Sequence, residues 1–304
     1  MNEVIVPSQV QFNEQDRIKE GTLRFGDMYA GRKVSQFTTP RGGRHYEVDG
    51  YQFDFASVTS ITGVVNKRGI PDWYKKKGIE KAIDIMSKPG AQERLELQAK
   101  GKNDRARKHK NHTWQTQLYD EAKVGPKEAM DFATEFGNDS HQLIEAMALM
   151  DIGRPRLDTP STENQYIPII EGFKAWLRDS NIELVASELM VYHPAYKYAG
   201  TIDLVGIKMS DPLSMVVIDI KTGGVFDEAA MQISAYAEAL DYLTAPEWHV
   251  DDAIVLQLPR ERPTEWDADK LYEIYKVNDI QGYFDAFDTA YKLRGLLEKE
   301  AWQS

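Results

Sequence analysis

Cysteine is absent from the 304 residues of this chain. Without thiols the chain cannot form a disulfide, which fits a protein of a reducing compartment such as the cytoplasm. The sequence also lacks an apolar run long enough to span a bilayer, and its first residues lack the basic start and apolar stretch of a signal peptide. We therefore expect a cytoplasmic protein that does not associate with membranes.

The chain also lacks the marks of a motor protein and of a repeat protein. No G-x-x-x-x-G-K phosphate loop occurs, so we expect no ATP binding and no built-in helicase. No internal repeat, low-complexity tract or strong interdomain linker divides the sequence, which is long enough to bury a sizeable core. We predict an N-terminal β/helical extension over residues 1–126 and a mixed α/β (α+β) core domain over residues 127–304.

Local patterns predict the order of the elements. Short strands and turns are expected in residues 20–65, with a hairpin at 41–43, and helices over 71–100 and 113–150 with breaks at 89–90 and 125–126. An amphipathic helix over 164–181 precedes three strands, and a helix over 227–243, strands at 252–258 and 272–277 and a closing helix from about 279 follow.

The most informative stretch is VVIDIKTG at residues 216–223, where two charged residues interrupt an apolar strand. Side chains alternate across a strand, so Asp219 and Lys221 point to one face while Ile218 and Ile220 point to the other. An acid and an amine held together on a rigid element can bind a divalent cation with a water or a phosphate beside it. This pattern indicates nuclease chemistry.

An acidic-x-Lys triplet alone is weak support, and the chain contains a second one at Glu121–Lys123, which we interpret as a solvated helix face. The triplet at Asp219 differs because two further acids enter neighbouring apolar strands. Asp203 lies in YAGTIDLVG (198–206), and Glu188 lies in SELMVYH (187–193). Each acid by itself fits a satisfied structural carboxylate, but the ordered set favours a catalytic site.

These residues carry a family resemblance. The motifs are Glu188, Gly200-x-x-Asp203, Asp219-x-Lys221-Thr222-Gly223, Gln232-x-x-x-Tyr236 and the helical segment FGNDSHQLIE (136–145) with His141. Together they resemble the PD-(D/E)xK nuclease superfamily in its RecB-like exonuclease branch, over roughly residues 127–260. A looser likeness to stand-alone phage and mitochondrial genome-maintenance members covers residues 46–62 and the segment around Trp73. Many relatives carry four cysteines for an iron–sulfur cluster, which this chain cannot build.

The resemblance implies a restriction-endonuclease-like core, a central mixed sheet flanked by helices, in which Mg²⁺ or Mn²⁺ is the cofactor. The expected metal ligands are His141, Asp203, Asp219 and the carbonyl of Ile220. Lys221 would support the attacking water or the phosphoryl charge. Glu188 would orient a metal-bound water or Lys221 without binding the metal itself. Gln232 and Tyr236 would hold the surroundings of Lys221 or a DNA phosphate; alternatively they are an ordinary polar pair on an amphipathic helix.

A net charge of −11 disfavours DNA binding, but the charge is unevenly distributed. Residues 67–112 hold 14 Lys and Arg against 6 Asp and Glu, a local charge of +8 that leaves −19 on the rest. The densest cluster consists of Lys100, Lys102, Arg105, Arg107, Lys108 and Lys110, followed by Trp114. It is typical of a surface for single-stranded DNA, although a charged loop without contacts and a buried indole fit the same pattern.

The favoured interpretation is a metal-dependent DNA exonuclease that hydrolyses single-stranded DNA or DNA ends in phage or mobile-element replication or recombination. A recombination protein or a single-strand-binding protein would be a fitting partner. Two alternatives stay open: a site-specific restriction-type endonuclease, and a nucleic-acid-binding protein that kept the fold without catalysis. Cleavage polarity, strand preference, processivity, oligomeric state and the number of metals are not determined by these patterns.

Overall fold

The computed structural model describes residues 34–38, 44–65, 70–105, 113–154, 164–261 and 271–297. The chain forms two compact units: residues 67–138 make up one, and residues 1–66 together with 139–304 make up the other. The predicted division into an N-terminal extension (residues 1–126) and a core domain (residues 127–304) concerns function, and it stays a prediction. Among the described residues no helix is both long and apolar enough to cross a membrane.

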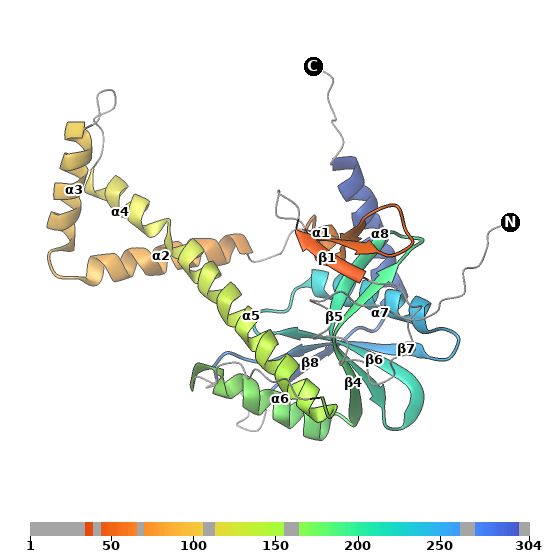
Figure 1. The fold of residues 1–304 in the computed structure, drawn as a ribbon. Coiled ribbons are helices and arrows are strands. Elements are labelled where there is room, and N and C mark those ends of the chain that lie inside the picture. The colour runs from red at the N-terminus through yellow and green to blue at the C-terminus, as the bar shows by residue number, and fades with distance from the viewer. Residues whose placement is uncertain are drawn as a thin grey trace, which may run out of the picture. The chain divides into compact units, whose positions relative to one another are not determined.

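The smaller unit is helical (Figure 1). Its helices are α2 (Ile70–Ser87), α3 (Ala91–Arg105), α4 (Trp114–Ala122) and the first part of α5 (Gly125–Asp151). The predicted breaks at 89–90 and 125–126 are confirmed, because α3 begins after Gly90 and α5 begins at Gly125. Ion pairs link the helices, with Arg94 Nη1 3.0 Å from Glu121 Oε2 and Lys81 Nζ 2.7 Å from Glu128 Oε2.

The larger unit contains a mixed eight-stranded sheet formed by the described strands. They are β1 (Val34–Thr38), β2 (Arg44–Val48), β3 (Phe55–Ser57), β4 (Ile182–His193), β5 (Tyr198–Lys208), β6 (Asp211–Lys221), β7 (His249–Gln257) and β8 (Glu273–Lys276). The order is β1-β2-β3-β5-β6-β7-β8, and β4 pairs with β5. The predicted hairpin is confirmed as a β1–β2 pair, while residues 41–43 of its turn lie outside the described residues.

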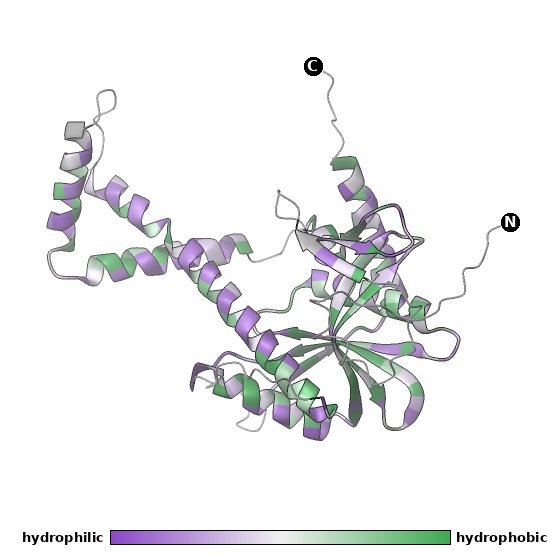
Figure 2. Cartoon of the chain, viewed as in Figure 1, coloured by the Kyte–Doolittle hydropathy of each residue, from purple (hydrophilic) through white to green (hydrophobic). Residues whose placement is uncertain are grey.

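Helices cover this sheet, as predicted. Short α1 (Val58–Thr62) follows β3, the 3₁₀ turn η2 (Asn164–Tyr166) leads into α6 (Ile167–Asp179), and α7 (Asp227–Thr244) and α8 (Ile280–Leu297) follow later. One core cluster joins Val217 and Val255 of the sheet to buried residues of α7 and α8. Ile218 is also buried but lies outside that cluster, so both faces of β6 are covered. Figure 2 shows the apolar residues concentrated on the central strands.

Strand β5 pairs with two different strands, β3 and β6, at different points along its length. Its first residues pair with β3 in parallel, through Tyr198 opposite Ala56, whereas Leu204 and the residues after it pair with antiparallel β6. The last β5–β6 pair toward this end is Leu204 with Ile218. The strands therefore part at the next residues, Asp203 and Asp219.

Candidate metal and catalytic site

Asp203 lies where β5 leaves β6, and two groups hold its carboxylate. The backbone N–H of Ile220 donates to its Oδ2 at 2.7 Å, and His141 Nδ1 lies 3.4 Å from its Oδ1. Burial alone would raise the pKa of this carboxyl, but His141, Lys221 and the Ile220 N–H together hold it below its usual range. Asp203 is therefore an anion inside the protein.

His141 reaches Asp203 from α5, whose position is fixed locally by Tyr166. The Tyr166 hydroxyl donates to Asp139 Oδ2 at 2.6 Å, two residues before His141. Burial opposes charge on the imidazole, but the Asp203 and Asp219 carboxylates raise the pKa of His141 to about 9. The imidazole therefore holds a proton and carries a positive charge between these two carboxylates.

Glu188 on β4 lies opposite Asp203 in the register that continues between the pairs Ser187–Leu204 and Leu189–Ile202. Its φ of 52° lies in the left-handed region, which a residue with a side chain adopts only when its surroundings require it. A register shift after Leu184 precedes this position. Such backbone strain often lies at functional sites, so it adds to the interest of Glu188 as a site residue.

His141, Glu188 and Asp203 form the group of described residues that could hold a metal ion. Each offers one ligand atom, and these atoms lie within 4.8 Å of one another. Imidazole and carboxylate donors suit Mn²⁺ and Mg²⁺. Sequence reasoning predicted that Glu188 would orient a metal-bound water or Lys221, whereas the structure groups it with the possible metal donors. The sequence could not place it there because the grouping joins residues of α5, β4 and β5.

Asp219 and Lys221 share one face of β6, as the alternation of the strand predicted. Lys221 Nζ lies 2.5 Å from Asp219 Oδ2. Burial and the nearby Asp203 raise the pKa of the Asp219 carboxyl, while Lys221 opposes that rise. Burial works against a charged Lys221, but Asp219 and Asp203 outweigh it and raise the pKa of the amine. Lys221 therefore carries its proton beside two acids.

Gln232 and Tyr236, the predicted pair on α7, lie next to Asp219. Gln232 Nε2 donates to Asp219 Oδ1 at 3.1 Å and lies 3.2 Å from the Tyr236 hydroxyl. Tyr236 packs against Gly200 so closely that a Cβ there would lie 2.3 Å from its Cε1. The glycine of the Gly200-x-x-Asp203 motif thus has a physical reason: it makes room for the ring that positions Gln232.

Ile220 contributes to the site through its N–H on Asp203. The predicted role of its carbonyl as a metal ligand stays a prediction. The turn after Lys221 is held from two sides, because Gln257 Nε2 donates to the Gly223 carbonyl at 2.7 Å and Arg260 Nε donates to the Thr222 carbonyl at 3.0 Å. Sequence reasoning missed Arg260, which follows β7 without any local motif.

Tyr46 on β2 is a second residue that sequence reasoning missed. Its hydroxyl lies 3.3 Å from Thr201 Oγ1, in the segment between Gly200 and Asp203. Burial raises the pKa of Tyr46, and the charge of Glu188 adds to that rise. The N-terminal strands thereby contribute to the surroundings of the site, and a lone tyrosine in a short strand offered no signal for it.

The predicted DNA-guiding cations lie in the smaller unit or outside the described residues. Lys100 and Lys102 are exposed on α3, Lys102 Nζ lies 3.1 Å from Asp120 Oδ2, and Arg105 is the last residue of α3. Arg107, Lys108 and Lys110 lie outside the described residues. Trp114 is half-buried at the beginning of α4, between the two environments predicted for it.

Acids, an amine and an imidazole therefore meet at the point where two central strands part, and three of them, His141, Glu188 and Asp203, lie close enough together to hold a metal ion. In comparisons with known proteins, no family model matches this chain and no curated protein does.

Proposed function

We propose that this chain is a metal-dependent deoxyribonuclease, an exonuclease that hydrolyses phosphodiester bonds of single-stranded DNA or DNA ends. The observation that carries the proposal is the meeting of His141, Glu188 and Asp203 with the Asp219–Lys221 pair at the parting of β5 and β6. The resemblance of these motifs to RecB-like nucleases supports the same activity, and it suggests a setting in phage or mobile-element replication or recombination.

The donor set fits a hard divalent cation, and Mg²⁺ or Mn²⁺ is the proposed cofactor. His141, Glu188 and Asp203 would hold it, with Asp219 adjacent, and a cation would neutralise the negative charge of the carboxylates at these half-buried positions. Once bound, such an ion supplies Lewis acidity toward a phosphodiester and lowers the pKa of water beside it. To serve as a ligand, His141 would give up the proton that the acids now favour on its imidazole.

The protein's own groups orient and stabilise the reacting phosphate. Lys221 keeps a protonated amine at the site, partly accessible at 29% side-chain exposure, where it can donate to a phosphoryl oxygen. Gln232 holds one oxygen of Asp219, which leaves the other oxygen directed to Lys221. The pair is thereby fixed before DNA binds, as electrostatic stabilisation of a transition state requires.

The test is digestion of end-labelled single-stranded, duplex and closed circular DNA with Mg²⁺ or Mn²⁺. We expect release of nucleotides from ends, with circular DNA intact. Lys221→Ala should lower the rate by about 100-fold or more, because a donor to developing charge is lost, while DNA affinity changes little. Lys174→Ala, an exposed lysine on α6, is the matched control and should cleave like the wild type.

Three outcomes would contradict parts of the proposal. Cleavage of closed circles would identify an endonuclease. DNA binding without cleavage under any metal would identify a binding protein on the same fold. Cleavage by Lys221→Ala within a few-fold of the wild type would mean that the catalytic group lies elsewhere.

A further inference from the structure

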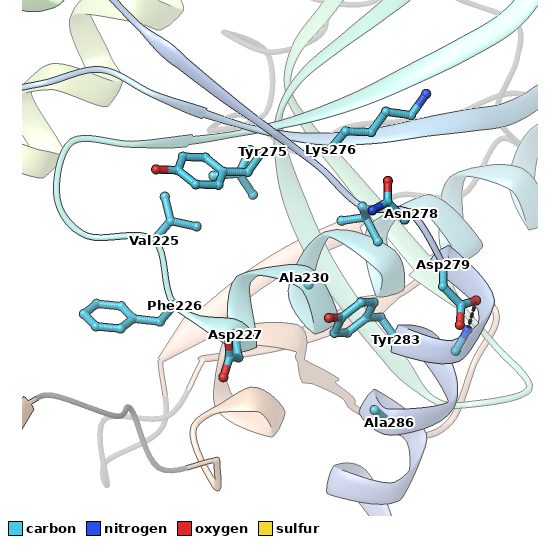
Figure 3. Close-up of a pocket in the computed structure, with 13 residues that line it drawn as sticks. Val225, Phe226, Asp227, Ala230, Tyr275, Lys276, Asn278, Asp279, Tyr283 and Ala286 are labelled. Carbon is cyan, nitrogen blue, oxygen red and sulfur yellow. Dashed lines mark hydrogen bonds between the residues drawn. The ribbon is translucent and has the colours of Figure 1, made fainter. Parts of the chain in front are cut away.

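A cavity of about 780 Å³ lies beside the site, between the beginning of α7, the strands β7 and β8 and the beginning of α8. Three aromatic side chains, Phe226, Tyr275 and Tyr283, belong to its wall. Figure 3 shows Tyr275 and Phe226 toward one end and Asp279 at the other. Small-molecule sites occupy roughly 300–1,000 Å³, so this cavity has room for a group as large as a nucleoside.

The sheet register ties this cavity to the candidate catalytic site. Asp219 is paired with Val255 on β7, and Val255 is paired with Tyr275 on β8. Paired residues of neighbouring strands point to the same face, so Val255 and Tyr275 share the face of Asp219. Strands lie about 5 Å apart, which puts the two residues about 5 Å and 10 Å from Asp219 across the sheet.

The chain that leaves the site also builds the cavity. Val225 and Phe226, on the connection from β6 to α7, line it together with Asp227, the first residue of α7. A strand of DNA with a phosphate at Lys221 therefore has its neighbouring nucleotide within reach of this wall.

The chemistry of the wall suits a base and not a phosphate. Tyr275 and Tyr283 are 42% and 40% exposed, so their rings are open to stacking from the solvent side. Asp227 and Asp279 place negative charge at the wall, which repels phosphate. The amine of Lys276, also in the wall, lies 2.5 Å from Asp252 Oδ1 and is already paired.

We propose that this cavity binds one unpaired nucleobase of single-stranded DNA, next to the phosphate that the site cleaves. The proposal rests on the proposed function for its ligand. It deepens that function, because the cavity would admit a nucleotide only after it has left the stack of a duplex. The aromatic wall would hold the base while the acidic rim keeps the phosphates on the side of Lys221.

The first test needs no variant. A short labelled single strand is bound to the full-length protein in EDTA, where a metal nuclease does not cleave, and each nucleotide in turn is replaced by an abasic one. We expect one position at which the abasic change weakens binding by about 10-fold, which is in the range known for base stacking. In a second strand that carries 2-aminopurine at that position, protein binding should quench its fluorescence. Equal affinity at every position, or no binding of single strands, would overturn the proposal.

The second test fills the cavity. Ala286→Trp adds an indole at an exposed lining position of α8, and Gln281→Trp, exposed on the same helix outside the lining, is its control. We expect Ala286→Trp to weaken binding of the intact strand by about 10-fold. Binding of the strand that is abasic at the sensitive position should not change, because that strand has no base to place in the cavity. Tyr283→Ala should act in the same direction. If Ala286→Trp matches Gln281→Trp on both strands, the base lies elsewhere.

These binding measurements are independent of cleavage. A position-specific abasic effect in a protein that never cleaves DNA would leave the base site standing and refute the nuclease. Cleavage of DNA without any abasic-sensitive position would support the nuclease and refute the base site.

Discussion

At the scale of single residues, Gly200 shows how an absent side chain builds the site. The Tyr236 ring occupies the space that a Cβ at Gly200 would need, and Tyr236 contacts Gln232, which in turn holds Asp219. A small change on β5 therefore reaches the carboxylate on β6 through a helix, without altering any charged residue.

Gly200→Ala should destabilise the protein by about 1–3 kcal/mol, the usual cost of overpacking, and it should lower cleavage because Tyr236 and Gln232 shift. The measurement is urea unfolding beside the cleavage rate. Gly295→Ala is the matched control, because nothing lies within 4 Å of its added Cβ on α8. That variant should gain about 0.5–1 kcal/mol from the lower helix cost of Ala. Equal stabilities of the two variants would remove the steric argument.

At the scale of elements, the end of β4 is held to α7 and the neighbouring hairpin by an aromatic cluster around His193. The imidazole lies 4.6 Å from the Tyr242 ring centroid, 4.8 Å from that of Tyr196 and 5.7 Å from that of Tyr198. Its Nδ1 accepts from the Tyr196 N–H at 3.4 Å. Burial lowers the pKa of His193 to about 4, so this packing requires the neutral ring.

Stability should therefore fall as the pH drops from about 6.5 toward 4. In that window unfolded chains protonate His193 while folded chains do not, so the stabilisation that is complete above the unfolded pKa is lost toward the folded pKa. The loss amounts to about 3 kcal/mol at 1.36 kcal/mol per pKa unit. Urea unfolding between pH 7 and 4 should show a flatter profile for His193→Phe than for the wild type. His249→Phe, at an exposed position, should follow the wild type; a wild-type slope in His193→Phe would contradict the assignment.

At the scale of the whole molecule, charge is separated along the chain. Residues 67–112 carry +8 within a protein of −11, and this whole segment belongs to the smaller unit. Some of these cations are paired with acids inside the unit, as Lys102 is with Asp120. The excess that is left suits the phosphate backbone of DNA, and the acidic remainder disfavours other approaches.

Binding of single-stranded DNA should weaken steeply with salt. Replacing Lys100, Lys102, Arg105, Arg107, Lys108 and Lys110 with Gln should flatten the plot of log affinity against log salt by about 0.7 for each phosphate that these side chains neutralise in the wild type. Turnover at saturating DNA should be unchanged. Removing three exposed charges of the larger unit, at Lys174, Lys197 and Lys292, is the control. Identical slopes for both variants would show that DNA does not follow the basic segment.

Periodic features of the sequence determined much of the fold. The apolar repeat predicted the amphipathic helix over 164–181, found as Ile167–Asp179 after a 3₁₀ turn, and Gly and Pro predicted the breaks between the first helices. Strand alternation predicted that Asp219 and Lys221 share a face, which their 2.5 Å contact confirms. These features depend on neighbours a few residues apart, and local backbone geometry is enough to set them.

Only the tertiary structure decided which residues meet. Pairing of β3 with β5 places Ala56 opposite Tyr198 and brings Tyr46 toward the site. This pairing depends on how the whole sheet is buried and not on any local pattern. Glu188, predicted as a supporting residue, lies close enough to His141 and Asp203 to be a candidate donor. The cavity beside Val255 exists because α7 and α8 pack on the same face of the sheet. Such contacts depend on long-range packing, for which no local pattern in the sequence carries the information.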